Sequence, residues 1–275
     1  MIEGYSRGMT GVPACDEPSA SELVHAVRKR ALGRKWRHLA NERIDGSDPL
    51  IPRGKRFWQL SDDEHDAIAD LFESESARAL VLALSCRAPD ERVRIVDAAY
   101  WVKGCSSLGS VRYAVLVRIG GHKRGQLALI DLKEAPTPIP PIAKGASTPA
   151  NDAERVVAGA RSLSPNLGER MLAVDVCGKP MVMRELRPQD LKIEVGQFTR
   201  PEAIRAASHL AFVVGQAHAR QMDENTRHGW AEALNLESLG NLDAPPWLWR
   251  SVVALAARHE AGYLEHCRRY ALDRG

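Results

Sequence analysis

The rhythm of apolar and polar positions changes along the chain and predicts three regions. Residues 1–91 are highly charged with apolar positions at helical spacing, whereas residues 92–190 are rich in β-formers that often alternate with the period of a strand. Residues 191–275 return to helical spacing. We therefore expect an α+β fold with a helical, charged N-terminal region (1–91), a β-rich lobe (92–190) and a helical region (191–275).

The N-terminal region carries two helix signals. Residues 22–43 contain no proline and place apolar side chains at roughly helical intervals. Further on, Ser61 and Glu64 have the spacing of a capping box, which predicts a helix from about 62 to 85.

The last region carries two more helix signals. Pro201 stands at a position typical of the first helical turn, so we expect a helix over 201–222. A final helix is expected over 247–272. Its predicted apolar face consists of Leu248, Val252, Leu255 and Ala256.

The middle region predicts an antiparallel five-stranded sheet with one helix. The strands are expected at 92–103, 110–119, 126–135, 170–177 and 180–186. Gly-containing turns at 104–110, 120–125 and 177–179 join neighbouring strands, which is typical of hairpins. A loop with five prolines follows the third strand and excludes a helix there. Asn151 or Asp152 then caps a helix over 152–163.

Composition and charge limit the partners, the cellular location and the metal sites that we expect for the protein. With 38 Lys+Arg and 35 Asp+Glu among 275 residues, the formal net charge is only +3, so nucleic-acid binding is not the expected main role. No apolar run reaches the roughly 18 residues of a membrane span, and no secretory signal precedes the charged region, which favours a cytoplasmic protein. The five cysteines include no C-x-x-C pair, so we expect no metal site.

The order of the middle elements indicates a function. Strand, Gly-containing turn, strand, hairpin, strand, helix, strand, hairpin and strand is the order found in the small lobe of protein-kinase-like phosphotransferases. In that lobe a glycine turn brings backbone N–H groups close to phosphates. A lysine on the third strand contacts phosphate oxygens, and a glutamate on the helix holds that lysine in place.

The candidate nucleotide-binding residues follow from this order. They are Gly104, Ser106, Ser107 and Gly109 in the turn, Lys133 in the third strand, Glu154 on the helix, and Glu185 in a segment (183–186) expected to connect two lobes and to bind an adenine edge. A lysine in an apolar strand needs a counter-charge, because an unpaired buried charge is costly. Glu134, Glu169 and Glu185 are alternatives to Glu154 for that role. The same residues also fit a purely structural interpretation. In it, the glycines form an ordinary turn between strands, and Lys133 is a solvent-exposed lysine on an edge strand.

A family resemblance is carried by GCSSLGSVRYAVLVR, LALIDLKEA, NDAERVVAGAR, MVMRELRPQD and LAFVVGQAHAR. Together these segments resemble the bacterial domain-of-unknown-function family 2252 over about residues 92–270, with weaker agreement over 50–91. The resemblance implies a kinase-like fold similar to aminoglycoside phosphotransferases, with ATP and Mg²⁺ as cofactors.

The chain departs from that family pattern at one place. Longer members carry Gly-Asp-x-His-x-x-x-Asn and Asp-Phe-Asp segments upstream, and this sequence contains neither Gly-Asp-x-His nor Asp-Phe. The resemblance therefore implies the C-terminal portion of a phosphotransferase, which binds nucleotide but does not transfer phosphate alone. The missing catalytic segment would come from the same gene or from another chain.

Two other functions stay open. The chain could be a non-catalytic binding module whose partner is a protein or a nucleic acid. A nucleic acid would bind through the basic helix 28–38, in which six of the eleven residues from Arg28 to His38 are Lys or Arg. It could also be an active enzyme that uses Asp175 or Asp190 as its acid. The catalytic residues are unassigned at this stage.

Overall fold

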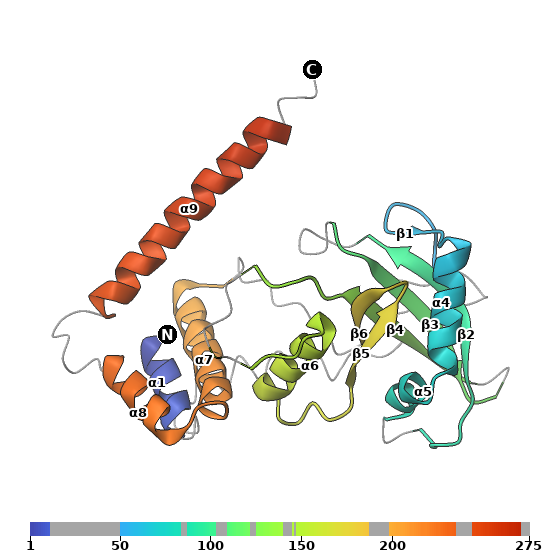
Figure 1. Ribbon diagram of the computed structural model, residues 1–275, viewed down its shortest axis with the longest axis horizontal. Helices are drawn as coiled ribbons and strands as arrows, with labels where there is room; N and C mark the ends of the chain where they lie inside the picture. Colours follow the sequence, from blue (N-terminus) through green and yellow to red (C-terminus); the bar gives the residue numbers. More distant parts are fainter. Residues whose placement is uncertain are drawn as a thin grey trace. The chain divides into compact units, whose positions relative to one another are not determined.

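The computed structural model describes residues 1–11, 50–83, 87–102, 109–121, 125–139, 145, 147–186, 198–234 and 244–270. The chain divides into two compact units. We call residues 21–197 the sheet unit, and residues 1–20 together with 198–275 the helical unit (Figure 1). The predicted helix over 22–43, with the basic segment 28–38, lies outside the described residues. None of the described helices combines the length and the apolar character needed to cross a bilayer.

The sheet unit contains one antiparallel sheet of six described strands, in the order β1-β2-β3-β4-β6-β5. The strands are β1 (Phe57–Trp58), β2 (Val93–Trp101), β3 (Arg112–Ile119), β4 (Gln126–Glu134), β5 (Met171–Val176) and β6 (Lys179–Leu186). The expected α+β class is confirmed, and the five predicted strands correspond to β2–β6. The predicted number of strands is wrong, because β1 extends the sheet by one.

Strand β1 comes from the region predicted to be helical. Its two residues pair with the end of β2, with Phe57 opposite Trp101. Phe57 is buried, and its ring centroid lies 5.5 Å from that of Trp101. A two-residue strand is too short to show alternation, so packing against the Trp101 ring explains why the chain is extended there.

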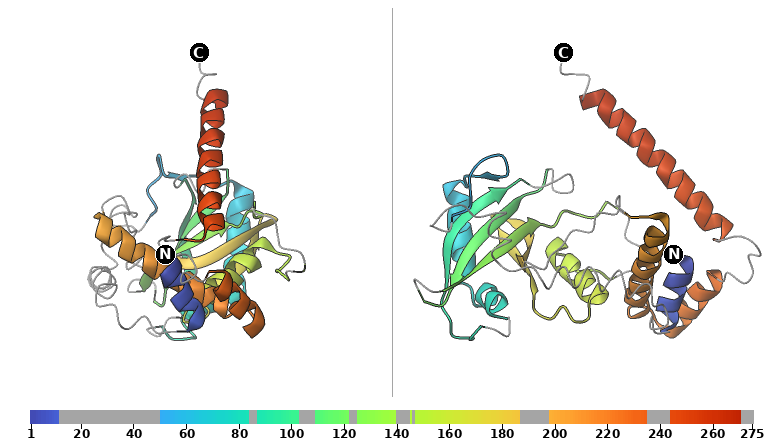
Figure 2. Two further views of the ribbon diagram at one scale, coloured as in Figure 1. Left: turned by 90° about the vertical axis from the view of Figure 1, so that its left-hand side faces the viewer. Right: turned by 180° about the vertical axis from the view of Figure 1, so that it is seen from behind.

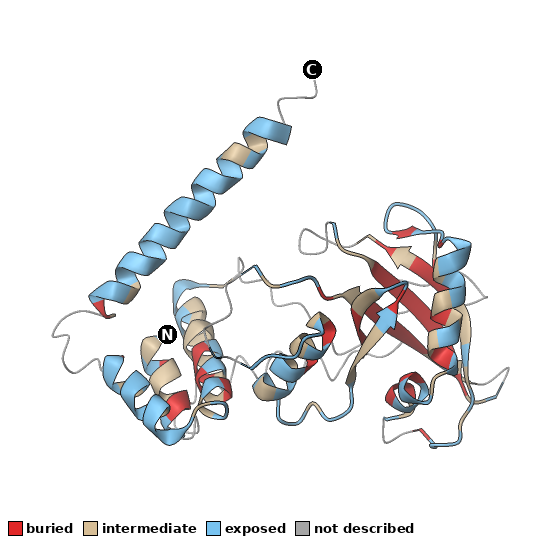
Figure 3. Ribbon diagram, viewed as in Figure 1, coloured by how far each residue is buried: buried red, intermediate tan, exposed pale blue. Residues whose placement is uncertain are grey.

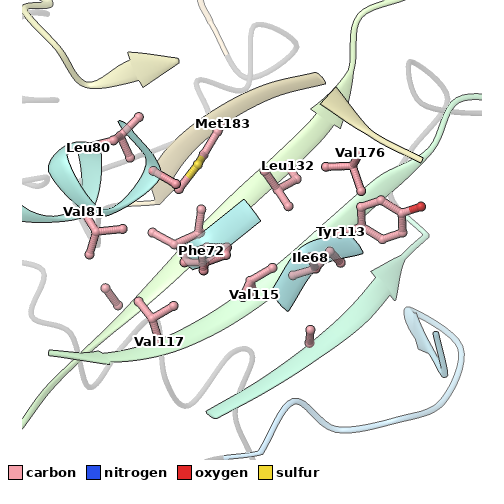
Figure 4. Packing of buried hydrophobic residues seen from close by; sticks show 14 of the residues in the cluster. Ile68, Phe72, Leu80, Val81, Tyr113, Val115, Val117, Leu132, Val176 and Met183 are labelled. Carbon is pink, nitrogen blue, oxygen red and sulfur yellow. The ribbon is translucent and has the colours of Figure 1, made fainter. Parts of the chain in front are cut away.

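One face of the sheet is covered by helices α4 (Asp62–Glu73) and α5 (Glu75–Leu82). Figure 4 shows the core between them and the strands, with Ile68, Phe72, Leu80, Val81, Tyr113, Val115, Val117, Leu132, Val176 and Met183 among its members. The capping box is confirmed, since Ser61 accepts from the Glu64 N–H at 3.3 Å and Glu64 accepts from the Ser61 N–H at 2.9 Å.

The predicted single helix over 62–85 is two helices. Ser74 has an extended backbone, with φ −68° and ψ 143°, and therefore ends α4. Its hydroxyl accepts a hydrogen bond from the Ala77 N–H and so caps α5. The break turns α5, so that Leu80 and Val81 reach the core.

The opposite face of the sheet is where the candidate site lies. Its core contains Ile51, Phe57, Ala99, Trp101, Ala114, Leu116, Leu129 and Leu186. Helix α6 (Asp152–Leu163), which begins after the predicted cap Asn151, packs Ala153 and Val157 against Val182 on the same face. In Figure 3 the central strands are buried, whereas much of α6 is exposed.

The helical unit consists of α1 (Ile2–Thr10), α7 (Arg200–Ala219), α8 (Glu224–Ala233) and α9 (Pro246–Tyr270) among the residues that the structure describes. Helices α1 and α7 lie side by side in both views of Figure 2. Glycines allow this approach, since a Cβ atom on Gly8 would lie 2.2 Å from the Phe212 carbonyl oxygen. Helices α1 and α8 add to the two helices predicted for this unit.

Candidate phosphate-binding site

The pairing of β4 with its neighbours places charged residues on one face of the sheet. Lys133 of β4 pairs directly with Arg112 of β3 on one side and with Val182 of β6 on the other. Two residues earlier, Asp131 pairs with Arg184 of β6. Directly paired residues point to the same face, and side chains two positions apart in a strand do so as well. We call Arg112, Asp131, Lys133 and Arg184 the cationic cluster.

Asp131 is the centre of this cluster. Its carboxylate accepts from Nε and Nη2 of Arg112, both at 2.7 Å, and from Nε of Arg184 at 3.3 Å. Asp131 is 1% exposed and Arg112 is 6% exposed. The Arg112 guanidinium also lies 4.3 Å from the centroid of the Trp101 ring, which stabilises its charge through a cation–π contact. One carboxylate therefore fixes the positions of two guanidinium groups.

The cluster carries more positive than negative charge. The cluster contains three cationic side chains and one carboxylate, so the formal charge of the four side chains is +2. Lys133 is half-buried, and no hydrogen bond or ion pair joins its ammonium group to another described residue. Like charges directly opposite each other in a sheet are destabilising, as with Arg112 and Lys133. The arrangement favours a bound anion, which would supply the missing negative charge.

The predicted glycine turn leads into this cluster. Gly109, exposed and with φ +78°, precedes β3, whose first residue Arg112 is the partner of Lys133. The Val111 N–H donates to Glu134 Oε2 at 2.6 Å, and the Glu134 N–H donates to the Val111 carbonyl at 2.9 Å. The end of the turn is thereby fixed beside the end of β4. Gly104, Ser106 and Ser107 lie outside the described residues.

The glutamate expected to pair with Lys133 is not in contact with it. Glu154 is exposed in the first turn of α6, and within the described ranges no hydrogen bond or ion pair joins its carboxylate to Lys133. Helix α6 nevertheless packs on the same face as Lys133, against the adjacent Val182.

The alternative acids are engaged elsewhere. Glu185 pairs with Ile130, on the face covered by α4 and α5, and its carboxylate binds Nη1 and Nη2 of Arg87 at 2.5 and 2.9 Å. Glu134 faces the same way and accepts from Lys179 Nζ at 3.3 Å. Glu169 accepts from Arg161. Among the described contacts, none joins Glu134, Glu169 or Glu185 to Lys133, so their role as its partner stays a prediction.

The segment predicted to connect two lobes lies within a strand of the sheet. Residues 183–186 lie in β6, and Met183 pairs with both Leu132 of β4 and Leu172 of β5. Pairing with β5 ends at Arg184, whereas pairing with β4 continues to Leu186. Beyond Arg184, this strand is therefore paired on one side only among the described strands.

Of the two acids of the alternative enzyme hypothesis, only Asp175 is described, and no hydrogen bond or ion pair joins it to the cluster. Asp175 accepts from the Gly178 N–H at 2.8 Å and so closes the hairpin between β5 and β6. Asp190 lies outside the described residues. Across the part of the chain that the structure describes, no group of three or more His, Cys, Asp or Glu side chains is arranged to hold a metal ion.

Sequence reasoning missed three members of the cluster. Arg112, Asp131 and Arg184 are charged residues inside strands whose other members are mostly apolar. The argument that supported Lys133, namely that a charge in an apolar strand needs a counter-charge, applies to these residues as well. The shared face becomes evident only from the register of β3, β4 and β6.

Comparison with known proteins identifies the family of this chain. No curated protein and no solved structure matches the chain. A family model described as "Uncharacterized protein conserved in bacteria (DUF2252)" matches residues 11–269, well beyond the segments that carried the resemblance. Because that match covers most of the 275 residues, the chain belongs to the DUF2252 family.

Proposed function

We propose that the sheet unit binds the phosphate groups of a nucleotide, with ATP as the expected ligand, and is the nucleotide-binding lobe of a kinase-like phosphotransferase. The observation that carries the proposal is the cationic cluster. Lys133 has no anionic partner among the described residues, and Asp131 holds Arg112 and Arg184 on the same face. Side chains with charge +2 in a partly buried setting suit a polyphosphate.

The order of elements supports the same proposal. The glycine turn precedes β3, Lys133 stands near the end of the third long strand, and α6 lies between that strand and the β5–β6 hairpin. Helix α6 packs on the face that carries Lys133. The one-sided pairing of β6 beyond Arg184 leaves backbone groups that could bind the edge of an adenine.

The described residues fit the phosphates better than they fit a metal ion. The only carboxylate of the cluster, Asp131, is occupied by two guanidinium groups. Because Gly-Asp-x-His and Asp-Phe do not occur in the sequence, we expect this chain alone to bind ATP without turning it over. We propose that a segment from the same gene or from another chain supplies the base and the metal ligands.

Titration calorimetry with ATP tests the proposal. Lys133→Ala removes a charge-assisted contact worth about 1.5–3 kcal/mol, so the dissociation constant should rise by about 10- to 150-fold. Lys179→Ala is the matched control, because Lys179 is on a neighbouring strand but binds Glu134 on the opposite face. It should change the affinity by less than about twofold. Equal affinity of the two variants would remove Lys133 from the site.

A further inference from the structure

Helix α9 exposes its apolar side chains along its whole length. None of its 25 residues is buried, and Figure 3 shows most of the helix as exposed. The side chains of Trp249, Tyr263 and Tyr270 are 64%, 63% and 66% exposed. Most helical stability in proteins comes from packing an apolar face against another element. A helix with several exposed aromatic rings therefore requires a partner surface.

The exposed side chains form a continuous stripe. Starting at Trp249, alternating steps of three and four residues reach Val252, Ala256, His259, Tyr263, His266 and Tyr270. This is the seven-residue repeat of helices that pair lengthwise. The opposite side of the helix carries Ala254, Arg258, Ala261 and Glu265. The stripe differs from the shorter face predicted from the sequence, because it runs through the C-terminal half of the helix.

We propose that α9 pairs antiparallel with α9 of a second copy of this chain. In that register Ala256 faces the partner's Tyr263, and Trp249 faces the partner's Tyr270. His259 of the two copies meets at the twofold axis. A small residue opposite a large one fills the space between the helices, whereas a parallel pair would place Ala256 opposite the partner's Ala256 and leave a gap.

The exposed area is large enough for a stable dimer. An aromatic side chain presents roughly 150–250 Å² when fully accessible, so the three exposed rings of each copy contribute on the order of 600–900 Å² in a pair. Val252, Val253 and Leu255, which are 50%, 54% and 69% exposed, extend the same surface. Together they reach the roughly 1,000 Å² that specific interfaces require.

An apolar groove at the start of α9 continues the stripe. It has a volume of about 940 Å³ and is lined by residues of α1, α7 and α8, among them Ile2, Tyr5, Leu210, Val214 and Trp230, and by α9 from Trp247 to Val252. In the antiparallel register the partner's Tyr270 lies opposite Trp249, at this groove. The groove and the stripe thus form one surface for the second copy.

Sedimentation equilibrium of the full chain tests the dimer. Ala256→Glu places two carboxylates inside the proposed interface, and we expect the dimer dissociation constant to rise at least about 100-fold. Ala254→Glu introduces the same side chain on the opposite face of α9 and should leave the constant within about threefold of wild type. A wild-type chain that is monomeric at about 100 µM, or equal effects of the two substitutions, would overturn the proposal.

A crosslinking experiment tests the orientation independently of stability. Val253 and the partner's Cys267 are neighbours only in the antiparallel register, so Val253→Cys should be joined to Cys267 by a short bismaleimide. Within one helix the two positions are about 21 Å apart, which is beyond the reach of this short bismaleimide, so a link between them must join two copies of the chain. Adding Ala256→Glu should abolish the link. Failure to link Val253→Cys to Cys267 in the dimer would contradict the antiparallel arrangement.

Discussion

The buried carboxylate of Asp131 makes a strong prediction about stability. Asp131→Asn keeps the shape of the side chain but removes the charge that faces Arg112 and Arg184. An amide has one oxygen acceptor, and its NH₂ group would face a guanidinium donor. The substitution therefore removes attraction and leaves a buried cation and its donors unsatisfied.

The expected loss is about 3–5 kcal/mol of the free energy of unfolding, the usual result when one partner of a buried ion pair is removed. The burial of both groups, 1% and 6% exposed, justifies this range rather than the smaller values of surface pairs. The cation–π contact of Arg112 with Trp101 remains in the variant and does not replace the lost charge.

Urea unfolding at neutral pH measures this loss. Asp70→Asn is the control, because Asp70 is exposed on α4 and should change the free energy of unfolding by less than about 0.5 kcal/mol. A double-mutant cycle with Arg112→Met should give a coupling energy of at least about 2 kcal/mol. If Asp131→Asn unfolds within about 1 kcal/mol of Asp70→Asn, Asp131 does not organise the cluster.

Two further predictions concern packing and buried hydrogen bonds. Gly8→Ala should destabilise the helical unit by about 1–3 kcal/mol, because the new Cβ atom would overlap the Phe212 carbonyl oxygen. The loss should appear as a lower melting temperature in circular dichroism. Gly229→Ala on α8 is the control, because no atom lies within 4 Å of its new Cβ atom, and it should be neutral or stabilising. Tyr113→Phe removes the 2.8 Å bond to Glu64 and should cost about 1 kcal/mol near pH 8. Burial, and secondly the hydrogen bond to Glu64, raises the pKa of Tyr113 above its usual 10. Above about pH 10 the tyrosine therefore ionises only in the unfolded chain, and the difference in unfolding free energy between wild type and Tyr113→Phe should shrink. A difference in urea unfolding that stays the same from about pH 8 to above about pH 10 would contradict this.

The strands were predictable because each is long enough to show its pattern. Strands β2–β6 each have at least six residues, and glycine turns separate several of them. The break at Ser74 was missed because neither glycine nor proline marks it, and a serine cap is visible only when the next helix is already recognised. Helix α1 could not be predicted because glycine has a low helix propensity. Its glycines are explained only by the close contact with α7, a helix about 200 residues further along the chain.

The candidate site was predictable in part. Lys133 followed from the order of the elements, supported by the rule that a charge in an apolar strand needs a counter-charge, and the register of the sheet then added the other three members. Glu134 could have been excluded from the sequence, because adjacent residues of a strand face opposite sides. Glu185 could not, since its face depends on how β6 pairs with β4.

The absence of an observed acidic contact to Lys133 bears on how an anion would be bound. In the predicted arrangement a glutamate neutralises the lysine, and the ligand then competes with that glutamate. In the described cluster, Asp131 is already shared by two guanidinium groups and lies on the same face as Lys133. No described carboxylate therefore balances the positive charge of Lys133, and in the proposed complex the ligand would do so. A polyphosphate would balance it without first displacing an ion pair, so the affinity lost in Lys133→Ala measures this contact directly.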